Sequence, residues 1–246
     1  MTPGARASAA IEVLADIDAR KRPASEALKD WGTAHRFAGS GDRAAIGNLV
    51  FDALRQRASN ADAMGEDTPR ALVLRTLVSS WGLTPEEVSA LADGSKFAPQ
   101  PLTPEELDGL RALPDDATPA HVRGNYPEWL DPTLARAFGD RRAEEGAALS
   151  RRAPVDLRVN ALKTTREKVL GALRRYGAEP TRFAPLGIRI EVPPAGGRSP
   201  HVEAEPGHGK GWFEVQDLGS QIATLLAGAK RREQVIDLCA GAGGKT

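Results

Sequence analysis

The chain has 246 residues, of which 41% are hydrophobic and 27% are charged, and its formal net charge is zero. These values are typical of a soluble globular protein with one large domain or two small ones. The single cysteine, Cys239, excludes an internal disulfide framework and a zinc site built on paired cysteines, and the four histidines lack metal-ligand spacing. The longest apolar runs, such as residues 222–229, are far shorter than the ~20 residues that cross a bilayer. We therefore expect a cytoplasmic protein with no signal peptide, no membrane span and no metal.

The first 120 residues are predicted to be almost entirely helical. Residues 7–19 place apolar side chains at three-residue steps, and residues 42–57 gather theirs on one helix face. Thr84 and Thr103 are each followed by Pro-Glu-Glu, the spacing of a capping box, and Thr68 precedes Pro69 as another helix start. These signals predict five or six helices in a compact bundle.

Proline, glycine and aspartate cluster between about 93 and 127, which indicates a connector, and two more helices are predicted before residue 152. The hydrophobic period then changes. Residues 155–160 and 186–192 alternate as strands do, and residues 164–177 between them have the pattern of a capped helix that ends at a glycine. This part is predicted to be a small mixed α/β unit.

The last 35 residues are predicted to form a strand, a helix and a second strand. WFEVQ (212–216) has a strand pattern, and residues 217–228 a helix pattern with Asp217 as its N-cap. QVIDL (234–238) is an apolar run that leads directly into glycines, so we expect a strand followed by a ligand-binding turn.

Charge is divided unevenly along the chain. Residues 1–150 carry 17 Lys and Arg against 23 Asp and Glu, whereas residues 151–246 carry 16 against 10. The C-terminal part is therefore the better candidate for contact with a polyanion, although exposed arginines are also commonly just solvated.

Three kinds of glycine-rich turn could follow the predicted strand 234–238. A P-loop requires a glycine where Cys239 stands, and a dinucleotide fingerprint requires one at Thr246. The opening turn of an S-adenosylmethionine-dependent methyltransferase has an acidic residue followed by small residues at alternate positions. Asp237, Cys239, Gly241 and Gly243 fit that pattern if cysteine replaces the first glycine. A plain turn between a strand and a helix remains the alternative.

Three segments resemble one known family. DLCAGAGGKT resembles the D-L-C-A-A-P-G-G-K-T signature of the Sun/Fmu (RsmB/NOP-type) family of bacterial ribosomal RNA cytosine-5 methyltransferases, with Gly241 and Ala242 in place of Ala and Pro. FEVQDLGSQIATLLAG is similar to the family's V-Q-D-x-x-S-Q helix, and LRVNALKTTREKVLGAL to its L-R-V-N-x-L-K segment. The three segments occur in the family's order over about 90 residues. GSGDRAAIGNLVFDALRQR and the helix content resemble its NusB-like bundle.

The resemblance implies a cofactor, S-adenosylmethionine, and a set of residues that hold it. The turn that would line the methionine and ribose side of the cofactor comprises Cys239, Ala240, Gly241, Ala242, Gly243, Gly244 and Lys245. Gln216, Asp217 and Ser220 resemble a cap beside this pocket, with helix capping the favoured role. In the family a cysteine thiolate adds to C6 of cytosine, which makes C5 nucleophilic. That cysteine belongs to a motif downstream of the glycine turn, so we expect no catalytic residue within this chain.

The resemblance also implies RNA, most simply ribosomal RNA, as the partner of a monomeric protein. Arg158 and Asn160 lie in the segment similar to the family's RNA-facing insert, and Arg43, Arg55 and Arg57 could add contacts from the helical part. Exposed polar residues of a strand, or a solvated helix face, are the simpler alternatives.

The expected fold is therefore multi-domain. A NusB-like RNA-binding bundle over residues 1–125 would be followed by connector helices over 126–152 and a small α/β RNA-facing insert over 153–205. Residues 206–246 would begin a Rossmann-like class I methyltransferase domain, truncated here and so inactive in isolation. The alternative function is a non-catalytic RNA- or ribosome-binding module.

Overall fold

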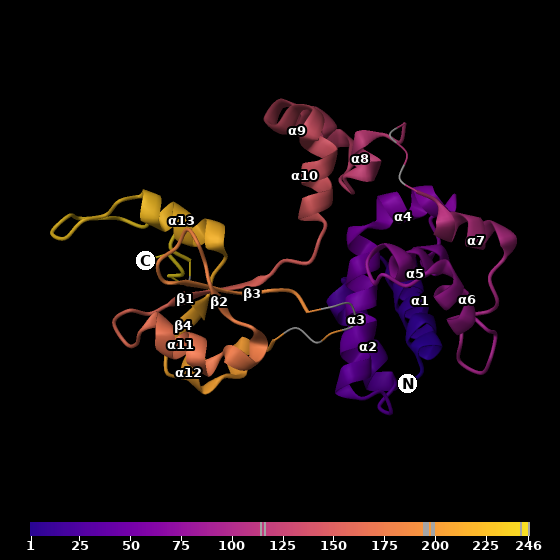
Figure 1. Ribbon diagram of the computed structural model, residues 1–246, viewed down its shortest axis with the longest axis horizontal. Coiled ribbons are helices and arrows are strands. Elements are labelled where there is room, and N and C mark those ends of the chain that lie inside the picture. The colour runs from indigo at the N-terminus through magenta and orange to yellow at the C-terminus, as the bar shows by residue number, and fades with distance from the viewer. Residues whose placement is uncertain (114, 116, 194–196, 198–199, 242, 246) are drawn as a thin grey trace. The chain divides into compact units, whose positions relative to one another are not determined.

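The structure, a computed structural model, describes residues 1–113, 115, 117–193, 197, 200–241 and 243–245 (Figure 1). It divides into two compact units. The first unit comprises Met1–Arg152 with Pro193–Arg198, and the second comprises Ala153–Val192 with Ser199–Thr246. Within the described residues, no helix is long and apolar enough to span a membrane.

The first unit is all-helical. Its elements are α1 (Pro3–Arg20), α2 (Ala24–Ala34), α3 (Ser40–Arg55), α4 (Arg57–Met64), α5 (Pro69–Ser79), α6 (Pro85–Leu91), α7 (Pro104–Arg111), α8 (Ala120–Arg123), η1 (Glu128–Leu130), α9 (Asp131–Phe138), η2 (Gly139–Arg141) and α10 (Arg142–Leu149). The capping boxes predicted at Thr84 and Thr103 are both present, and Thr68 caps α5. The described residues up to Arg111 form seven helices rather than five or six, because the run 42–57 ends at Gln56 and a new helix starts at once.

Aliphatic side chains from α1, α3 and α5 fill the core of the first unit. Leu14, Ile46, Leu49, Leu72 and Leu74 are almost completely buried there. Burial of each such side chain contributes about 1.5–3 kcal/mol relative to exposure, which is the main source of stability for a bundle of short helices.

The second unit is built on a four-stranded antiparallel sheet. Its elements are β1 (Val155–Val159), α11 (Arg166–Ala172), η3 (Arg174–Tyr176), β2 (Glu179–Pro180), β3 (Gly187–Ile190), η4 (Val202–Ala204), α12 (Pro206–Gly209), β4 (Phe213–Val215) and α13 (Leu218–Leu226). The strand order is β2-β3-β1-β4, and every pairing is antiparallel. The chain order β1-α11-β2-β3-α12-β4 with this sheet order is the split βαβ arrangement of ferredoxin-like domains.

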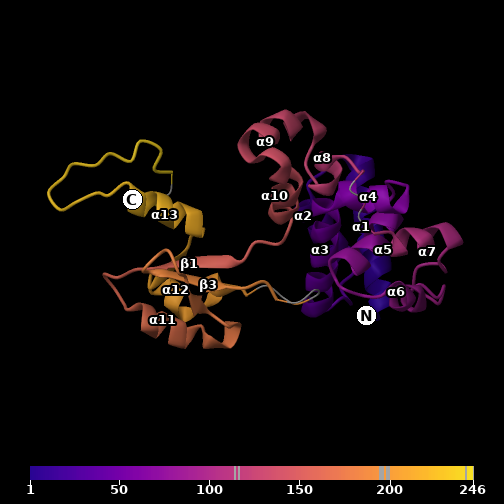
Figure 2. The ribbon, with the colours of Figure 1, turned by 45° about the horizontal axis from the view of Figure 1, so that its top comes forward.

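The two faces of this sheet carry different side chains. Leu157, Val159, Ile188, Ile190 and Phe213 form a buried cluster with the apolar side chains of α11. Helices α11 and α12 lie on one side of the sheet and α13 on the other (Figures 1 and 2). Because side chains alternate along a strand, Asp156 and Arg158 lie on the face opposite Leu157 and Val159.

One sequence prediction for the last part of the chain does not match the structure. The strand predicted at 234–238 is wrong: no strand is formed there, and Val235, Ile236 and Leu238 are 65%, 86% and 90% exposed. A parallel strand needs a neighbour to pair with, and no described strand lies beside this segment, which Figure 2 shows as an extended loop after α13. In addition, β4 pairs with β1, so the boundary expected at 205/206 falls inside the second compact unit.

Gly187 of β3 has no room for a side chain. A Cβ at this position would lie 2.2 Å from Thr181 Oγ1 and 3.0 Å from Ala184 Cβ. We expect Gly187→Ala to destabilise the second unit by about 1–3 kcal/mol, as overpacking usually does. Gly171→Ala is the control, because nothing lies within 4 Å of its Cβ position in α11. Chemical denaturation should show a loss for the first variant and no loss for the second, and equal stability of the two would contradict this packing.

Candidate functional site: a glycine turn beside a polar sheet face

The helix α13 begins at a side-chain cap, as the sequence predicts. Asp217 Oδ1 accepts hydrogen bonds from the backbone N–H groups of Gly219, at 2.8 Å, and Ser220, at 3.3 Å. An aspartate in this position satisfies N–H groups that have no partner within the helix. The cap fixes where α13 starts and therefore where the residues just before it lie.

Asp156 joins the sheet to α13. Its carboxylate is buried and accepts two hydrogen bonds from Arg189 of β3, from Nε at 2.7 Å and from an Nη at 2.8 Å. It also accepts the backbone N–H of Leu218 at 3.0 Å. The hydrogen bond to Asp156 raises the pKa of the Arg189 guanidinium, which stays charged. A bidentate, charge-assisted pair of this kind orients both partners.

Two buried glutamines lie between this pair and the glycine turn. The backbone N–H of Gln216 donates to the carbonyl of Asp156 at 3.0 Å, and Gln221 Nε2 donates to the carbonyl of Gln216 at 2.8 Å. Gln216 Nε2 donates in turn to the carbonyl of Gly244. The side-chain oxygens of both glutamines are buried with no hydrogen-bond partner among the described residues. Gln216 therefore ties the glycine turn to the beginning of α13.

The glycine turn itself is open. Gly241 and Gly243 have positive φ angles of 55° and 81°, and Gly243 N donates to the carbonyl of Ala240 at 2.9 Å. Nothing lies within 4 Å of the Cβ positions of Gly241, Gly243 or Gly244. Cys239 is exposed, as is Lys245, and Ala242 lies outside the described residues. The backbone is therefore accessible at these three glycines.

Part of this region has the chemistry that a site for an amino acid and a ribose requires. The accessible backbone of the glycine turn and the exposed Lys245 provide donors and acceptors of the kind that an amino acid and a ribose require. No three His, Cys, Asp or Glu side chains within the described residues gather as metal ligands would.

Of the candidate RNA-binding residues in the second unit, Arg158 is half-buried in β1, opposite Glu214 of β4 and Gly187 of β3. Asn160 organises the turn after β1. Its Oδ1 accepts the backbone N–H of Leu162 at 3.1 Å, and its carbonyl accepts the N–H of Lys163 at 3.0 Å. The structure thus gives Asn160 a role in shaping its loop.

The candidates of the first unit are engaged in contacts within that unit. Arg43 Nε donates to the carbonyl of Ala38 at 2.9 Å. Arg55 pairs with Asp52 at 3.2 Å. Arg57 contacts Asp18 and Asp67, both at 2.8 Å, and its hydrogen bond to Asp18 raises its pKa. Contacts of this kind stabilise the helix packing and reduce the charge left for a ligand.

Sequence reasoning missed the pairing of Asp156 with Arg189. A signal for the pair was present in the sequence. Asp156 is a polar residue of the alternating segment 155–160, and Arg189 is a polar residue of the alternating segment 186–192. Opposite charges facing each other across two antiparallel strands stabilise a sheet. The register needed to recognise the pair, Asp156 opposite Arg189, comes only from the structure.

Comparison with known proteins agrees with the motif assignments. Residues 126–195 match the family model described as the ferredoxin-like domain of RsmF/B-like methyltransferases. The match includes β1, α11, β2 and β3, whose topology is ferredoxin-like, together with α9 and α10. Residues 126–195 are therefore similar to the ferredoxin-like domain of these methyltransferases.

Individual relatives extend the similarity beyond this domain. The chain is 32% identical over 144 residues to a probable ribosomal RNA small subunit methyltransferase B of Synechocystis. It is 37% identical over 123 residues to the ribosomal RNA small subunit methyltransferase B of Photorhabdus laumondii and 35% over 137 residues to that of Sodalis glossinidius. Over these segments the chain is similar to this group of proteins, which is the family that its motifs resemble.

The similarity covers part of each chain. The matches cover 57%, 49% and 55% of this chain but only 31%, 27% and 30% of the respective relatives. Among solved structures, the one titled "Crystal Structure of PH0851" superimposes with a TM-score of 0.51 at 16% identity, covering 92% of this chain and 56% of that one. At this identity the likeness concerns the fold alone.

Proposed function

We propose that this chain is part of an S-adenosylmethionine-dependent RNA methyltransferase that transfers a methyl group to C5 of a cytosine in ribosomal RNA. The observation that carries the proposal is the contact between two of the family-like motifs, since Gln216 of the V-Q-D motif bonds to Gly244 of the glycine turn. The names of the relatives support the choice of ribosomal RNA.

Each part of the chain has a role in this proposal. The backbone of residues 239–245 would hold the amino-acid and ribose portions of S-adenosylmethionine, and this cofactor would supply the methyl group. Gln216 and Asp217 fix the turn and the start of α13 relative to each other. The helical first unit is proposed to be NusB-like and to bind RNA, and the second unit to present the RNA to a Rossmann-like domain that begins at the glycine turn.

Chemistry at C5 requires a nucleophile that adds to C6, because the pyrimidine ring alone is too weakly nucleophilic at C5. Cys239 is the only thiol in residues 1–246, and it is exposed on the glycine turn. It occupies a position where methyltransferase turns have a small residue beside the cofactor. We therefore place the nucleophile outside residues 1–246 and propose that Cys239 serves as a small residue beside the cofactor.

The test uses the protein as its gene encodes it, with RNA that contains 5-fluorocytosine. This analogue cannot lose a proton from C5, so it holds the covalent adduct between enzyme and RNA. We expect Cys239→Ala to keep the adduct and to change cofactor affinity by no more than about 1 kcal/mol, as for a minor packing change. Denaturing gel electrophoresis measures the adduct.

Loss of the adduct in Cys239→Ala with cofactor binding intact would place the nucleophile in this chain and contradict the proposal. Cys239→Leu is the matched variant, because its larger side chain should fill the space in front of the turn and prevent cofactor binding. Absence of any adduct in the wild-type protein would favour the non-catalytic RNA- or ribosome-binding module instead.

A further inference from the structure

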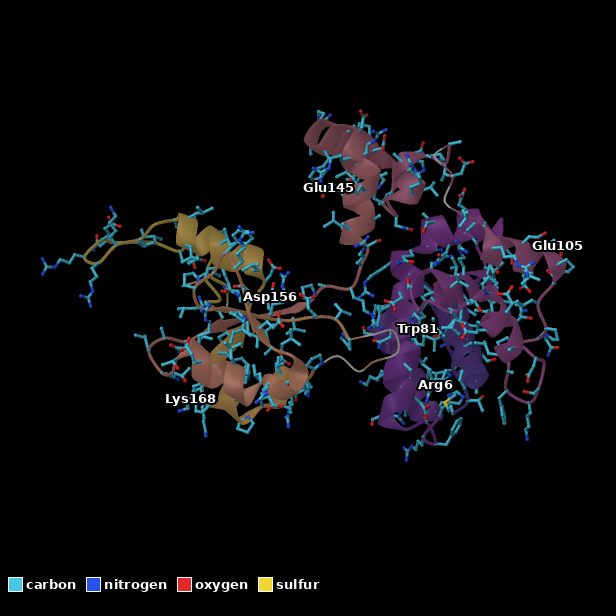
Figure 3. The ribbon with its side chains drawn as sticks, viewed as in Figure 1. Arg6, Trp81, Glu105, Glu145, Asp156 and Lys168 are labelled. Atoms are coloured by element: carbon cyan, nitrogen blue, oxygen red, sulfur yellow. The ribbon has the colours of Figure 1, made fainter. Side chains whose placement is uncertain are left out.

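Three lysines surround Trp212 in the second unit. Lys168 Nζ of α11 lies 4.3 Å from the centre of the Trp212 ring system, and Lys210 Nζ lies 5.1 Å from it. A Cβ added to Gly211 would be 2.7 Å from Lys163 Nζ, so this third ammonium group rests against the backbone next to Trp212. Lys163 and Lys168 are close in sequence, whereas Lys210 comes from a later segment. Lys168 projects from α11, on the side of the sheet away from α13 (Figure 3).

The backbone around Trp212 is held on both sides. The N–H of Trp212 donates to the carbonyl of Gly207 at 2.9 Å, and the Trp212 carbonyl accepts the N–H of Asn160 at 2.8 Å. Gly207 packs under the ring, since a Cβ there would be 3.2 Å from Trp212 Cε3. The indole therefore has a fixed position, and its electron-rich face can restrain an ammonium group that would otherwise sample many rotamers.

The charge of this lysine cluster, Lys163, Lys168 and Lys210, is left unneutralised. All three side chains are exposed, and none has a carboxylate within 4.0 Å in the part of the chain that the structure describes. By contrast, the nearby Arg175 pairs with Glu205. Three positive charges held near one another repel, which lowers the stability of the fold. An anion bound between them would remove this repulsion, so the cluster is suited to binding one.

We propose that the lysine cluster binds backbone phosphates of the RNA strand, with Trp212 as a positioning residue. This inference rests on the proposed function, from which it takes RNA as the partner, and it adds the residues that contact the RNA. Ammonium groups bind phosphate as point charges without selecting the base. Contacts of this kind set the register of the RNA and leave recognition of the cytosine to the reaction site.

The experiment measures binding of a fluorescent single-stranded ribosomal RNA segment by anisotropy at a series of salt concentrations. Lys163→Gln, Lys168→Gln and Lys210→Gln are combined in one variant. The control combines Lys21→Gln, Lys29→Gln and Lys96→Gln, which removes the same charge from exposed lysines of the first unit. Lys96 is a close match for Lys210, because its Nζ lies 5.1 Å from the ring centre of Phe97, as Lys210 Nζ does from that of Trp212.

We expect the cluster variant to bind on the order of tenfold more weakly at low salt. Its slope of log affinity against log salt should be smaller by about 2, at ~0.7 per phosphate contact on a single strand. The control should keep the wild-type slope, because it leaves in place Arg43, Arg55 and Arg57, the candidate RNA contacts of the first unit. Trp212→Leu should weaken binding with little change in slope, because the charges remain, and Trp212→Phe should restore most of the affinity.

Equal slopes for wild type and the cluster variant, with binding intact, would overturn the phosphate site but leave the proposed function in place. Absence of wild-type RNA binding would overturn both. A further measurement compares the RNA displaced by inorganic phosphate with the RNA displaced by chloride at the same ionic strength. We expect the two salts to displace equal amounts of RNA. Stronger displacement would show a site for a free anion and contradict the assignment to RNA.

Discussion

Asp156→Ala is expected to destabilise the second unit by about 3 kcal/mol and to release α13 from the sheet. Asp156 is buried and holds Arg189 and the N–H of Leu218 at once. Removing one partner of a buried ion pair costs about 3–5 kcal/mol. We expect the lower end, because the Arg189 side chain is 35% exposed and can regain water. Native-state hydrogen exchange of the β1, β3 and α13 amides measures both effects.

The matched control for Asp156 is Asp217→Ala, which removes an exposed cap from the same helix. Loss of an N-cap costs about 1 kcal/mol. Its effect should be confined to the first turn of α13, where Gly219 and Ser220 lose their acceptor. If Asp156→Ala exchanged no faster than Asp217→Ala in β1 and β3, the buried carboxylate would not be what joins the sheet to α13.

Gly243→Val is expected to reduce S-adenosylmethionine affinity at least about tenfold in the full gene product, which corresponds to ~1.4 kcal/mol. Gly243 has φ 81°, a conformation that costs roughly 1–2 kcal/mol for a residue with a Cβ. The valine side chain would also occupy the open space in front of the turn, where nothing now lies within 4 Å. Isothermal titration calorimetry with the cofactor gives the affinity.

Gly244→Ala is the control for the turn. Its Cβ position is equally open, but its φ is not in the positive range where a side chain is strained. We expect a change of less than about threefold. Equal losses for the two variants would mean that the positive φ of Gly243 has no part in cofactor binding, and unchanged binding in both would remove the turn from the cofactor site.

Local signals in the sequence predicted much of the fold. The threonines before α5, α6 and α7, and Asp217 before α13, cap their helices by bonds between residues two or three apart, so their effect is readable from sequence. The strand 155–159 was likewise evident from its alternation. The strand predicted at 234–238 was wrong because an apolar run forms a strand only when a neighbour supplies the other half of its hydrogen bonds.

The sequence predicted the segments of the candidate site but not the contacts between them. The glycine turn and the residues of the Q-D motif could be found from short motifs, but their contact through Gln216 and Gly244 could not. The same holds for the lysine cluster around Trp212. Lys210 lies 42 positions beyond Lys168 and 47 beyond Lys163, and the ferredoxin-like topology of the sheet brings its segment to theirs. Long-range proximity of this kind depends on tertiary packing rather than on local pattern.

Methyl transfer from isotopically labelled S-adenosylmethionine to ribosomal RNA tests the central proposal most directly. The full gene product is incubated with unmodified small-subunit ribosomal RNA and cofactor carrying a trideuterated methyl group, and the RNA is digested and analysed by mass spectrometry. We predict a labelled methyl group on C5 of cytosine. Label on another base or another ring atom, or no label although the RNA and the cofactor both bind, would contradict it.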